Sequence, residues 1–180
     1  VLLAGESAGV LTEEGAKHTA CTVCKKELKK EVIAKRALEV PKVKIENASN
    51  GIKVSWSKDE DATGYTVYSS TYNATTKKWS AWKNRGTVAA TKSSWTDKTV
   101  KTGTSYKYTV RAVNGNTIST YLSTDSLLYL AQPTVKIANN ASGVKLSWNK
   151  IAGATGYTIY RQELVNGKWT GWKNLVTIKK

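Results

Sequence analysis

The stretch that decides the fold runs from Pro41 to Tyr68 and reads PKVKIENASNGIKVSWSKDEDATGYTVY. Apolar and polar residues alternate through Val43–Ile45, again through Ile52–Trp56, and a third time through Tyr65–Val67. This period of two is typical of strands that bury one face. The Asn50-Gly51 pair between the first two runs favours a tight hairpin turn, because both residues tolerate positive φ.

The same alternation continues downstream through Tyr106–Ala112, after a turn signal at Lys101–Gly103. Short strands spaced about 8–12 residues apart indicate an antiparallel β-sandwich, so the fold class is all-β. Two sheets are expected to close over Trp56 and Tyr106. The structural core is expected to contain Trp56, Tyr65, Val67, Tyr106 and Val110, with Trp148 and Tyr157 at matching places in a second copy.

The second copy is visible as an internal repeat. Pro133–Tyr160 matches Pro41–Tyr68 at about half of its positions, and Lys168–Asn174 matches Lys78–Asn84. A period of about 92 residues is too long for a solenoid and indicates tandem copies of one domain. The predicted organisation is a complete domain over 41–131 and the N-terminal half of another over 132–180, preceded by a separate segment over 1–40.

The complete copy resembles a known family. Trp56, the GYTVY run at Gly64–Tyr68 and the stretch VKTGTSYKYTVRAVN at Val100–Asn114 together resemble a fibronectin type III domain, a member of the immunoglobulin-like sandwiches. The wording SNGIKVSW and ATGYTVY is similar to copies in surface proteins of Gram-positive gut bacteria. The resemblance implies that Tyr106 is a tyrosine-corner residue, with its ring in the core and its hydroxyl bonded to nearby backbone.

The second copy lacks the half that would contain the tyrosine corner, so Trp148 and Tyr157 would have no facing sheet. Exposing such a face to solvent loses about 25 cal/mol of stabilisation per Å² of apolar area. Three explanations remain, in order of preference. The natural chain continues past Lys180; another chain donates the missing strands, as in strand-complemented filaments; or the half domain is disordered.

Residues 1–40 carry both cysteines and the one histidine. The stretch TEEGAKHTACTVCKKE resembles short CxxC repeats of the same class of surface proteins, which implies the end of a small β-hairpin module followed by a linker. His18, Cys21 and Cys24 are weak candidates for a metal site, since structural zinc usually needs a second Cys or His pair. A local disulfide or a pair of packed thiols is the default for an exported chain.

No catalytic or cofactor-binding residues are predicted. One histidine, two neighbouring cysteines and no nucleophile-elbow serine cannot supply a triad. The acidic cluster Asp59–Asp61 is expected to be a solvated turn, because its spacing is not that of a calcium loop. The chain is therefore expected not to be an enzyme.

The W-x-x-W pairs are the ligand-contact candidates: Trp79 with Trp82, and Trp169 with Trp172. Positions three apart on a strand point to opposite faces, so at least one indole of each pair is expected to be exposed or to lie at an edge. An exposed indole suits a sugar ring. The favoured interpretation is that one ring caps the sandwich while the other packs on Tyr68 or a neighbouring domain.

The net charge is +15, with lysines scattered through every segment. Such a field attracts polyanions, for example an anionic cell-wall polymer or a host glycan. Lysines on strand edges also prevent unwanted pairing. No recognition helix or basic stripe indicates specific nucleic-acid binding, and no apolar run approaches the roughly 20 residues that span a membrane.

These features predict a secreted, cell-surface protein of bacterial type with a structural or adhesive role. It would act as a spacer, or would contact other domains of the same protein, a host protein or a glycan. Two alternatives are an accessory region of a larger secreted carbohydrate-active enzyme and a self-assembling filament subunit. The ligand itself is not readable from the sequence.

Overall fold

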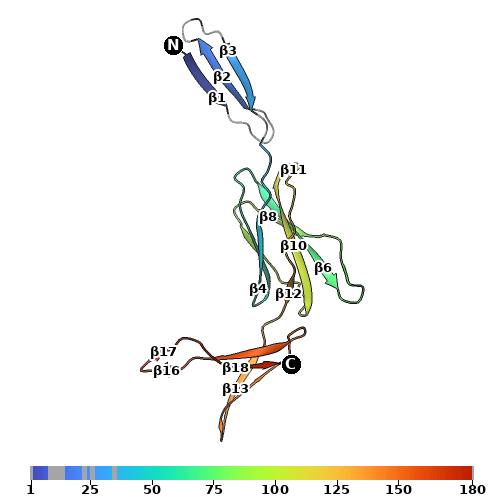
Figure 1. Ribbon diagram of the computed structural model, residues 1–180, viewed down its shortest axis with the longest axis vertical. Coiled ribbons are helices and arrows are strands. Elements are labelled where there is room, and N and C mark those ends of the chain that lie inside the picture. Colours follow the sequence, from blue (N-terminus) through green and yellow to red (C-terminus); the bar gives the residue numbers. More distant parts are fainter. Residues whose placement is uncertain (1, 8–14, 22–23, 25–26, 34–35, 180) are drawn as a thin grey trace.

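The structure, a computed structural model, describes residues 2–7, 15–21, 24, 27–33 and 36–179. Its elements form three bodies that follow one another along the longest axis, as Figure 1 shows: a small N-terminal sheet, a central two-sheet body and a C-terminal set of hairpins. Every regular element in these residues is a strand, and none of them is a helix that could span a membrane.

The N-terminal body is a three-stranded antiparallel sheet in the order β1-β2-β3, formed by Leu2–Ser7, Gly15–Cys21 and Glu27–Ile33. A third strand thus extends the hairpin that the CxxC segment predicts. Cys21 ends β2, and Cys24 lies in the turn that follows it.

The first sheet of the central sandwich contains β4 (Val43–Ala48), β5 (Gly51–Trp56) and β9 (Ser94–Asp97), in that order. The β4-β5 hairpin closes at the Asn50-Gly51 turn, with Ala48 opposite Gly51. A Cβ atom on Gly51 would lie 2.2 Å from the backbone oxygen of Asp97. Glycine is therefore required here, because the turn approaches β9 too closely for a side chain.

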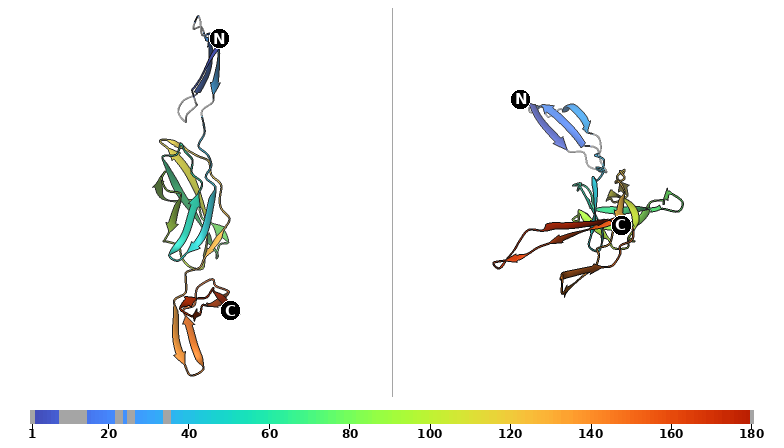
Figure 2. Two further views of the ribbon diagram at one scale, coloured as in Figure 1. Left: turned by 90° about the vertical axis from the view of Figure 1, so that its left-hand side faces the viewer. Right: turned by 60° about the horizontal axis from the view of Figure 1, so that its bottom comes forward.

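The second sheet is built on two long strands, β6 (Gly64–Asn73) and β10 (Thr104–Asn114), which pair antiparallel from Tyr106 opposite Thr71 to Val113 opposite Gly64. β8 (Lys83–Ala89) pairs with the outer edge of β6, and β12 (Leu127–Tyr129) pairs with β10. Two short strands extend it: β7 (Lys78–Trp79) beside the end of β6 and β11 (Thr117–Ile118) beside the end of β10. Apart from the two short extensions, three strands face four, and this arrangement is a fibronectin type III or immunoglobulin-like sandwich. Figure 2 shows the sandwich from two further directions.

The core fills the space between the two sheets. The inward positions of β6 and β10 recur at every second residue, as the sequence predicts, although Thr66 and Thr109 on the other face are buried too. Every core residue named from the first copy is buried: Trp56, Tyr65, Val67, Tyr106 and Val110. The Trp56 and Tyr65 rings pack 5.5 Å apart at 50°. Leu38 also belongs to this cluster, so the packed body begins ahead of Pro41.

The linker is held to the sandwich by an acidic turn that the sequence predicts to be solvated. Asp59 is instead 8% exposed. Its carboxylate accepts hydrogen bonds from the backbone N–H groups of Glu39, at 2.6 Å, and Asp61, at 2.8 Å, and it lies 3.5 Å from the Arg36 guanidinium. The prediction of a solvated turn is therefore wrong for Asp59, which ties residues 36–39 to the β5-β6 connection.

The Tyr106 hydroxyl accepts a hydrogen bond of 2.8 Å from the backbone N–H of Lys101, as a tyrosine corner requires. Replacing Tyr106 by phenylalanine is expected to lower the free energy of unfolding by about 1–3 kcal/mol, because it leaves that N–H without its partner. Urea denaturation followed by the amide signals of β6 and β10 measures the change. Tyr160→Phe, at a hydroxyl on a 53% exposed residue, is the matched control and should change little. Equal midpoints for the two variants would show that the corner bond does not stabilise the fold.

The C-terminal body repeats half of this plan. β13 (Val135–Asn140) pairs with β14 (Gly143–Trp148), and β15 (Gly156–Arg161) pairs with β18 (Lys173–Lys179). Between β15 and β18 lies a small hairpin of β16 (Leu164–Val165) and β17 (Lys168–Trp169). The described residues contain no counterparts of β9, β10 or β12 in this copy.

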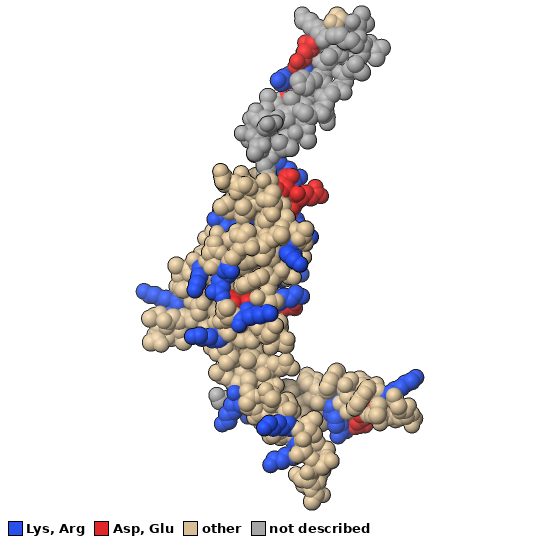
Figure 3. Space-filling view, turned by 180° about the vertical axis from the view of Figure 1, so that it is seen from behind, with Lys and Arg blue, Asp and Glu red and all other residues tan. Residues whose placement is uncertain are grey.

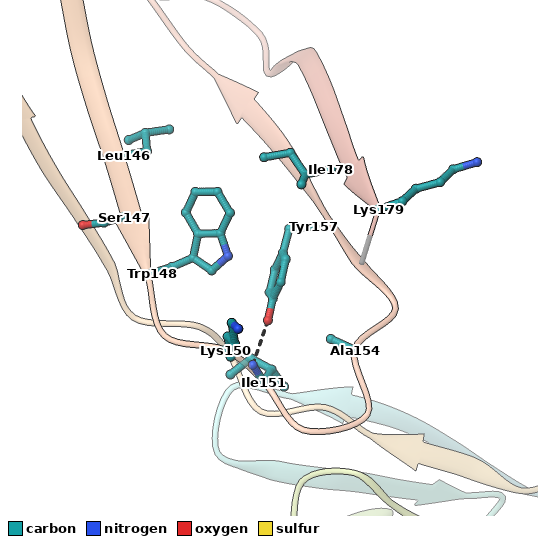
Figure 4. A pocket seen from close by; sticks show the side chains of 9 residues that line it. All are labelled: Leu146, Ser147, Trp148, Lys150, Ile151, Ala154, Tyr157, Ile178 and Lys179. Atoms are coloured by element: carbon teal, nitrogen blue, oxygen red, sulfur yellow. Dashed lines mark hydrogen bonds between the residues drawn. The ribbon is translucent and has the colours of Figure 1, made fainter.

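Trp148 and Tyr157 are consequently not buried, unlike Trp56 and Tyr65. The prediction that they belong to a core is wrong for the described structure, because no second sheet covers them. Their rings still pack 5.4 Å apart at 58°. Together with Ile178, the cross-strand neighbour of Tyr157, they line an open, mainly apolar groove of about 420 Å³ (Figure 4).

Candidate binding surfaces

The outer face of the β6-β10 sheet collects aromatic and basic side chains. Trp79 pairs across the hairpin with Tyr72, with ring centroids 5.3 Å apart, and the Lys107 ammonium lies 4.7 Å from the centroid of the Trp79 ring. Lys107 alternates along β10 with the inward Tyr106 and Tyr108, so it marks the outer face. Trp79 therefore lies on the outside of the sandwich.

Trp82 lies on the same face. Its ring packs edge-on against Tyr121 at 6.0 Å, and the Arg111 guanidinium lies 5.8 Å from the centroid of the Tyr121 ring. Arg111 is also an outward residue of β10. We call Tyr72, Trp79, Trp82, Lys107, Arg111 and Tyr121 the aromatic-basic face.

The prediction that Trp79 and Trp82 point to opposite faces is wrong. The prediction assumes one continuous strand through both indoles. In the structure β7 ends at Trp79, so Ser80 and Trp82 lie outside the strand. The Ser80 backbone N–H donates to the carbonyl of Thr71, and the Thr71 N–H donates to the Ser80 hydroxyl. This local exchange of bonds re-aims the residues that follow, so both indoles are only half-buried on one surface.

The corresponding indoles of the second copy are more exposed: Trp169 by 67% and Trp172 by 69%. In the first copy, Lys107 and Tyr121 belong to β10 and the segment after β11, and the described part of the second copy has no equivalent of either. The difference in exposure between the copies thus follows from the missing strands.

A buried charged cluster lies on the inner side of the same domain. Asp97 is 1% exposed. Its Oδ1 accepts hydrogen bonds from the N–H and the hydroxyl of Thr99 and from Nη2 of Arg85, at 2.9, 2.7 and 2.9 Å, and its Oδ2 accepts one of 3.0 Å from the Tyr108 hydroxyl. Every oxygen of this buried carboxylate therefore has a partner.

The contacts in this cluster determine the protonation states of Asp97 and Tyr108. Burial would raise the pKa of Asp97, but the hydrogen bonds from Thr99 and the Arg85 guanidinium outweigh it and hold the pKa below its ordinary value. Burial, followed by the nearby Asp97 charge, raises the pKa of the Tyr108 hydroxyl. Asp97 is thus ionised and Tyr108 protonated at neutral pH, which is the state in which the hydroxyl donates.

The sequence shows no motif for this cluster. The available signal is a difference between the copies: Arg85 aligns with Leu175 when Lys78–Asn84 is matched to Lys168–Asn174. A charged residue in one copy and an apolar residue in the other indicates that the side chain at this position has a different environment in the two domains.

The structure does not test whether His18, Cys21 and Cys24 form a metal site. Cys24 is an exposed free thiol, while the side chains of His18 and Cys21 lie outside the described residues. Among the side chains that are described, no three His, Cys, Asp or Glu residues form a group that could hold a metal ion.

Charge is dispersed over the molecule. On the face shown in Figure 3, lysine and arginine side chains are scattered over the central and C-terminal bodies and are not gathered over one element. A dispersed field of this kind favours general attraction of polyanions over a sequence-specific interface.

Comparison with known proteins finds remote structural neighbours only. No family model and no curated protein matches the chain. Among solved structures, the twitchin kinase region from C. elegans aligns with a TM-score of 0.44 and 17% identity over 69% of this chain and 21% of its own. The chicken CNTN1 FN1-FN3 domains align with a TM-score of 0.39 and 15% identity over 93% of this chain and 64% of theirs. The chain therefore spans about a fifth of one neighbour and less than two thirds of the other. The twitchin match falls on domains other than its kinase, and both neighbours contain fibronectin type III domains.

Proposed function

We propose that this chain is an extracellular structural and adhesive module of a bacterial surface protein, which spaces neighbouring domains and contacts a protein or a glycan. Sandwiches of this class generally serve as non-catalytic adhesive or structural modules. The observation that carries the proposal is the aromatic-basic face: two half-buried indoles on the outside of a tightly packed sandwich. Rigid aromatic side chains on a fixed sheet are suited to stacking against a ligand at small entropic cost.

The succession of bodies supports the spacer part of the proposal. Gly103 of the central sandwich and Gly153 of the C-terminal body approach so closely that a Cβ on Gly153 would lie 2.9 Å from the Cα of Gly103. At the other end, Asp59 binds the linker at Glu39. The close approach of the two glycines limits the swing of the C-terminal body, and the Asp59 contact shortens the free part of the linker, as a spacer requires.

The adhesive part is tested on a glycan array with the whole chain. A Trp79→Ala/Trp82→Ala variant is expected to weaken binding to any recognised glycan by at least about tenfold, which corresponds to about 1.4 kcal/mol. Leu122→Ala is the control, because it removes a 67% exposed apolar side chain near Tyr121 without removing a ring. Undiminished binding by the double variant, or an equal loss in the control, would exclude the indoles as the contact.

Two alternative functions are each supported by a specific observation. The exposed indoles suit an accessory region of a larger secreted carbohydrate-active enzyme, and the uncovered face of β14 and β15 suits a filament subunit completed by a neighbour's strands. Gel filtration separates the second from the proposal, since a filament subunit would elute as a concentration-dependent series of assemblies.

A further inference from the structure

A groove of about 370 Å³, lined mainly by polar residues, opens beside the Asp97 cluster, at the edge where β8 faces the chain after β9. Its lining includes the basic side chains of Lys83, Arg85 and Lys101 and the threonines Thr71 and Thr104. This size lies in the range of about 300–1,000 Å³ that is usual for sites of small ligands.

A β-bulge aims Arg85 into this groove. In the β6-β8 pairing, Val67 lies opposite Gly86 and Tyr68 lies opposite Asn84, so Arg85 is the extra residue. Gly86 has a φ of +125°, which an L side chain rarely adopts. A bulge re-directs the side chain of the inserted residue, and here it brings the guanidinium to Asp97 in the interior.

The Arg85 guanidinium has binding capacity left. Its hydrogen bonds to Asp97 and Thr99 use only Nη2. The described residues provide no hydrogen-bond acceptor for its Nε or Nη1, and neither atom is among the fully buried unsatisfied ones. A planar guanidinium with two nitrogens still to be used can bind a second oxyanion.

The charge of Asp97 does not oppose an anion in the groove. Both of its oxygens are already bonded, and Arg85 compensates its charge directly. Lys83 and Lys101 have no carboxylate within ion-pair distance among the described residues. The groove therefore carries an excess of positive charge that is not neutralised within the protein.

We propose that this groove binds a sugar unit that carries a sulfate or phosphate group, with the oxyanion held by Arg85, Lys83 and Lys101. The hydroxyls of Thr71 and Thr104 would bind the hydroxyl groups of the sugar ring, since a groove of this volume exceeds what one small anion occupies. The site is separate from the aromatic-basic face, because Arg85 and Asp97 lie on the inner side of the sheet. The groove would thus be one defined anion-binding site on a molecule whose positive charge is otherwise dispersed.

The second copy contains the same bulge without the charge. There Ile159 lies opposite Val176 and Tyr160 lies opposite Asn174, so the extra residue is Leu175. The bulge is thus a property of the fold, and the arginine with its buried acid is specific to the first copy. Binding is expected at the first copy only.

The test uses the whole chain and three small probes in low salt: N-acetylglucosamine 6-sulfate, N-acetylglucosamine 6-phosphate and uncharged N-acetylglucosamine. Titrations followed by heteronuclear NMR should show saturable shifts of the Arg85 Nε–H signal and of amides at residues 83–85 and 99–104 for the charged probes. Comparing the two charged probes tells sulfate from phosphate as the preferred group. A Lys83→Ala/Lys101→Ala variant should bind at least about tenfold more weakly, since each lysine supplies a charge-assisted contact.

The control is Lys44→Ala/Lys145→Ala, which removes the same charge from two exposed positions away from the groove. This variant should bind as the unaltered chain does, and unchanged amide spectra in both variants establish that they fold. Four results would overturn the proposal: no saturable binding, an equal loss in the control, equal affinity for the uncharged sugar, or shifts that map to Trp79 and Trp82 instead. If the glycan array gives no binder while the groove is occupied, only the proposed role of the indoles fails.

Discussion

Replacing Asp97 by alanine is expected to lower the free energy of unfolding of the central sandwich by about 3–5 kcal/mol, because it removes one partner of a buried ion pair. The Arg85 side chain is only 16% exposed and would be left beside the Tyr108 hydroxyl with no counter-charge. Urea denaturation at pH 7, followed by the amide signals of β6 and β10, measures the change.

Two further variants separate the causes. Asp125→Ala removes an exposed carboxylate and should change stability by less than about 0.5 kcal/mol. Asp97→Asn keeps the shape without the charge and should fall between the other two. If Asp97→Ala and Asp125→Ala unfold at the same urea concentration, the cluster does not hold the sandwich together.

The pH dependence of stability should change with the same substitution. The folded-state pKa of Asp97 is lowered, so its contribution is fully present above the ordinary value of about 3.9 and is lost as the pH falls through the lower folded pKa. Asp97→Asn should therefore flatten the acid limb of the stability curve below about pH 4. An acid limb identical to that of the unaltered chain would mean that Asp97 gains nothing from ionisation in the folded state.

Fusing a copy of residues 90–132 after Lys179 is expected to convert the C-terminal body into a second cooperatively folded sandwich. The receiving half is already shaped for it, because the Trp148–Tyr157 ring pair repeats the geometry of Trp56 and Tyr65. The Tyr157 hydroxyl accepts a 2.7 Å bond from Ile151 N–H, as the Tyr65 hydroxyl does from Asp59 N–H. Covering this face would gain about 25 cal/mol per Å² of apolar area.

NMR provides the readout for the fusion. The Trp148 indole should shift and gain contacts to the added strands, and the amides of β14 and β15 should become protected. A matched fusion, in which the added counterparts of Tyr108 and Val110 are replaced by serine, should fail to produce either change. A Trp148 environment that is identical in all three proteins would show that this face does not accept strands like β9, β10 and β12.

Most of the fold follows from local pattern. Strict alternation through Ile52–Trp56 and Tyr106–Ala112 gives the strands and their inward residues, since each strand has one buried face. The turn at Asn50-Gly51 and the corner at Tyr106 follow from residue types with few other uses. These features are recognisable because each depends on residues close together in the chain.

The surfaces were harder to predict because they depend on partners distant in sequence. The common face of Trp79 and Trp82 results from bonds between Ser80 and Thr71, which end the strand between the two indoles. The burial of Asp59 results from the linker at Glu39, and the Asp97 cluster joins residues of β8, β9 and β10. In the sequence alone, an aspartate is predicted to be exposed, because the hydrogen-bond donors that allow its burial come from residues distant in the chain.

Amide hydrogen exchange over the whole chain tests the central architecture most directly. The two-sheet body predicts that backbone N–H groups of β5, β6 and β10 exchange together, through one global opening, and far more slowly than those of β13, β14, β15 and β18. Uniform fast exchange in residues 64–73 and 104–114, or equal protection in both copies, would contradict a closed sandwich followed by an uncovered half.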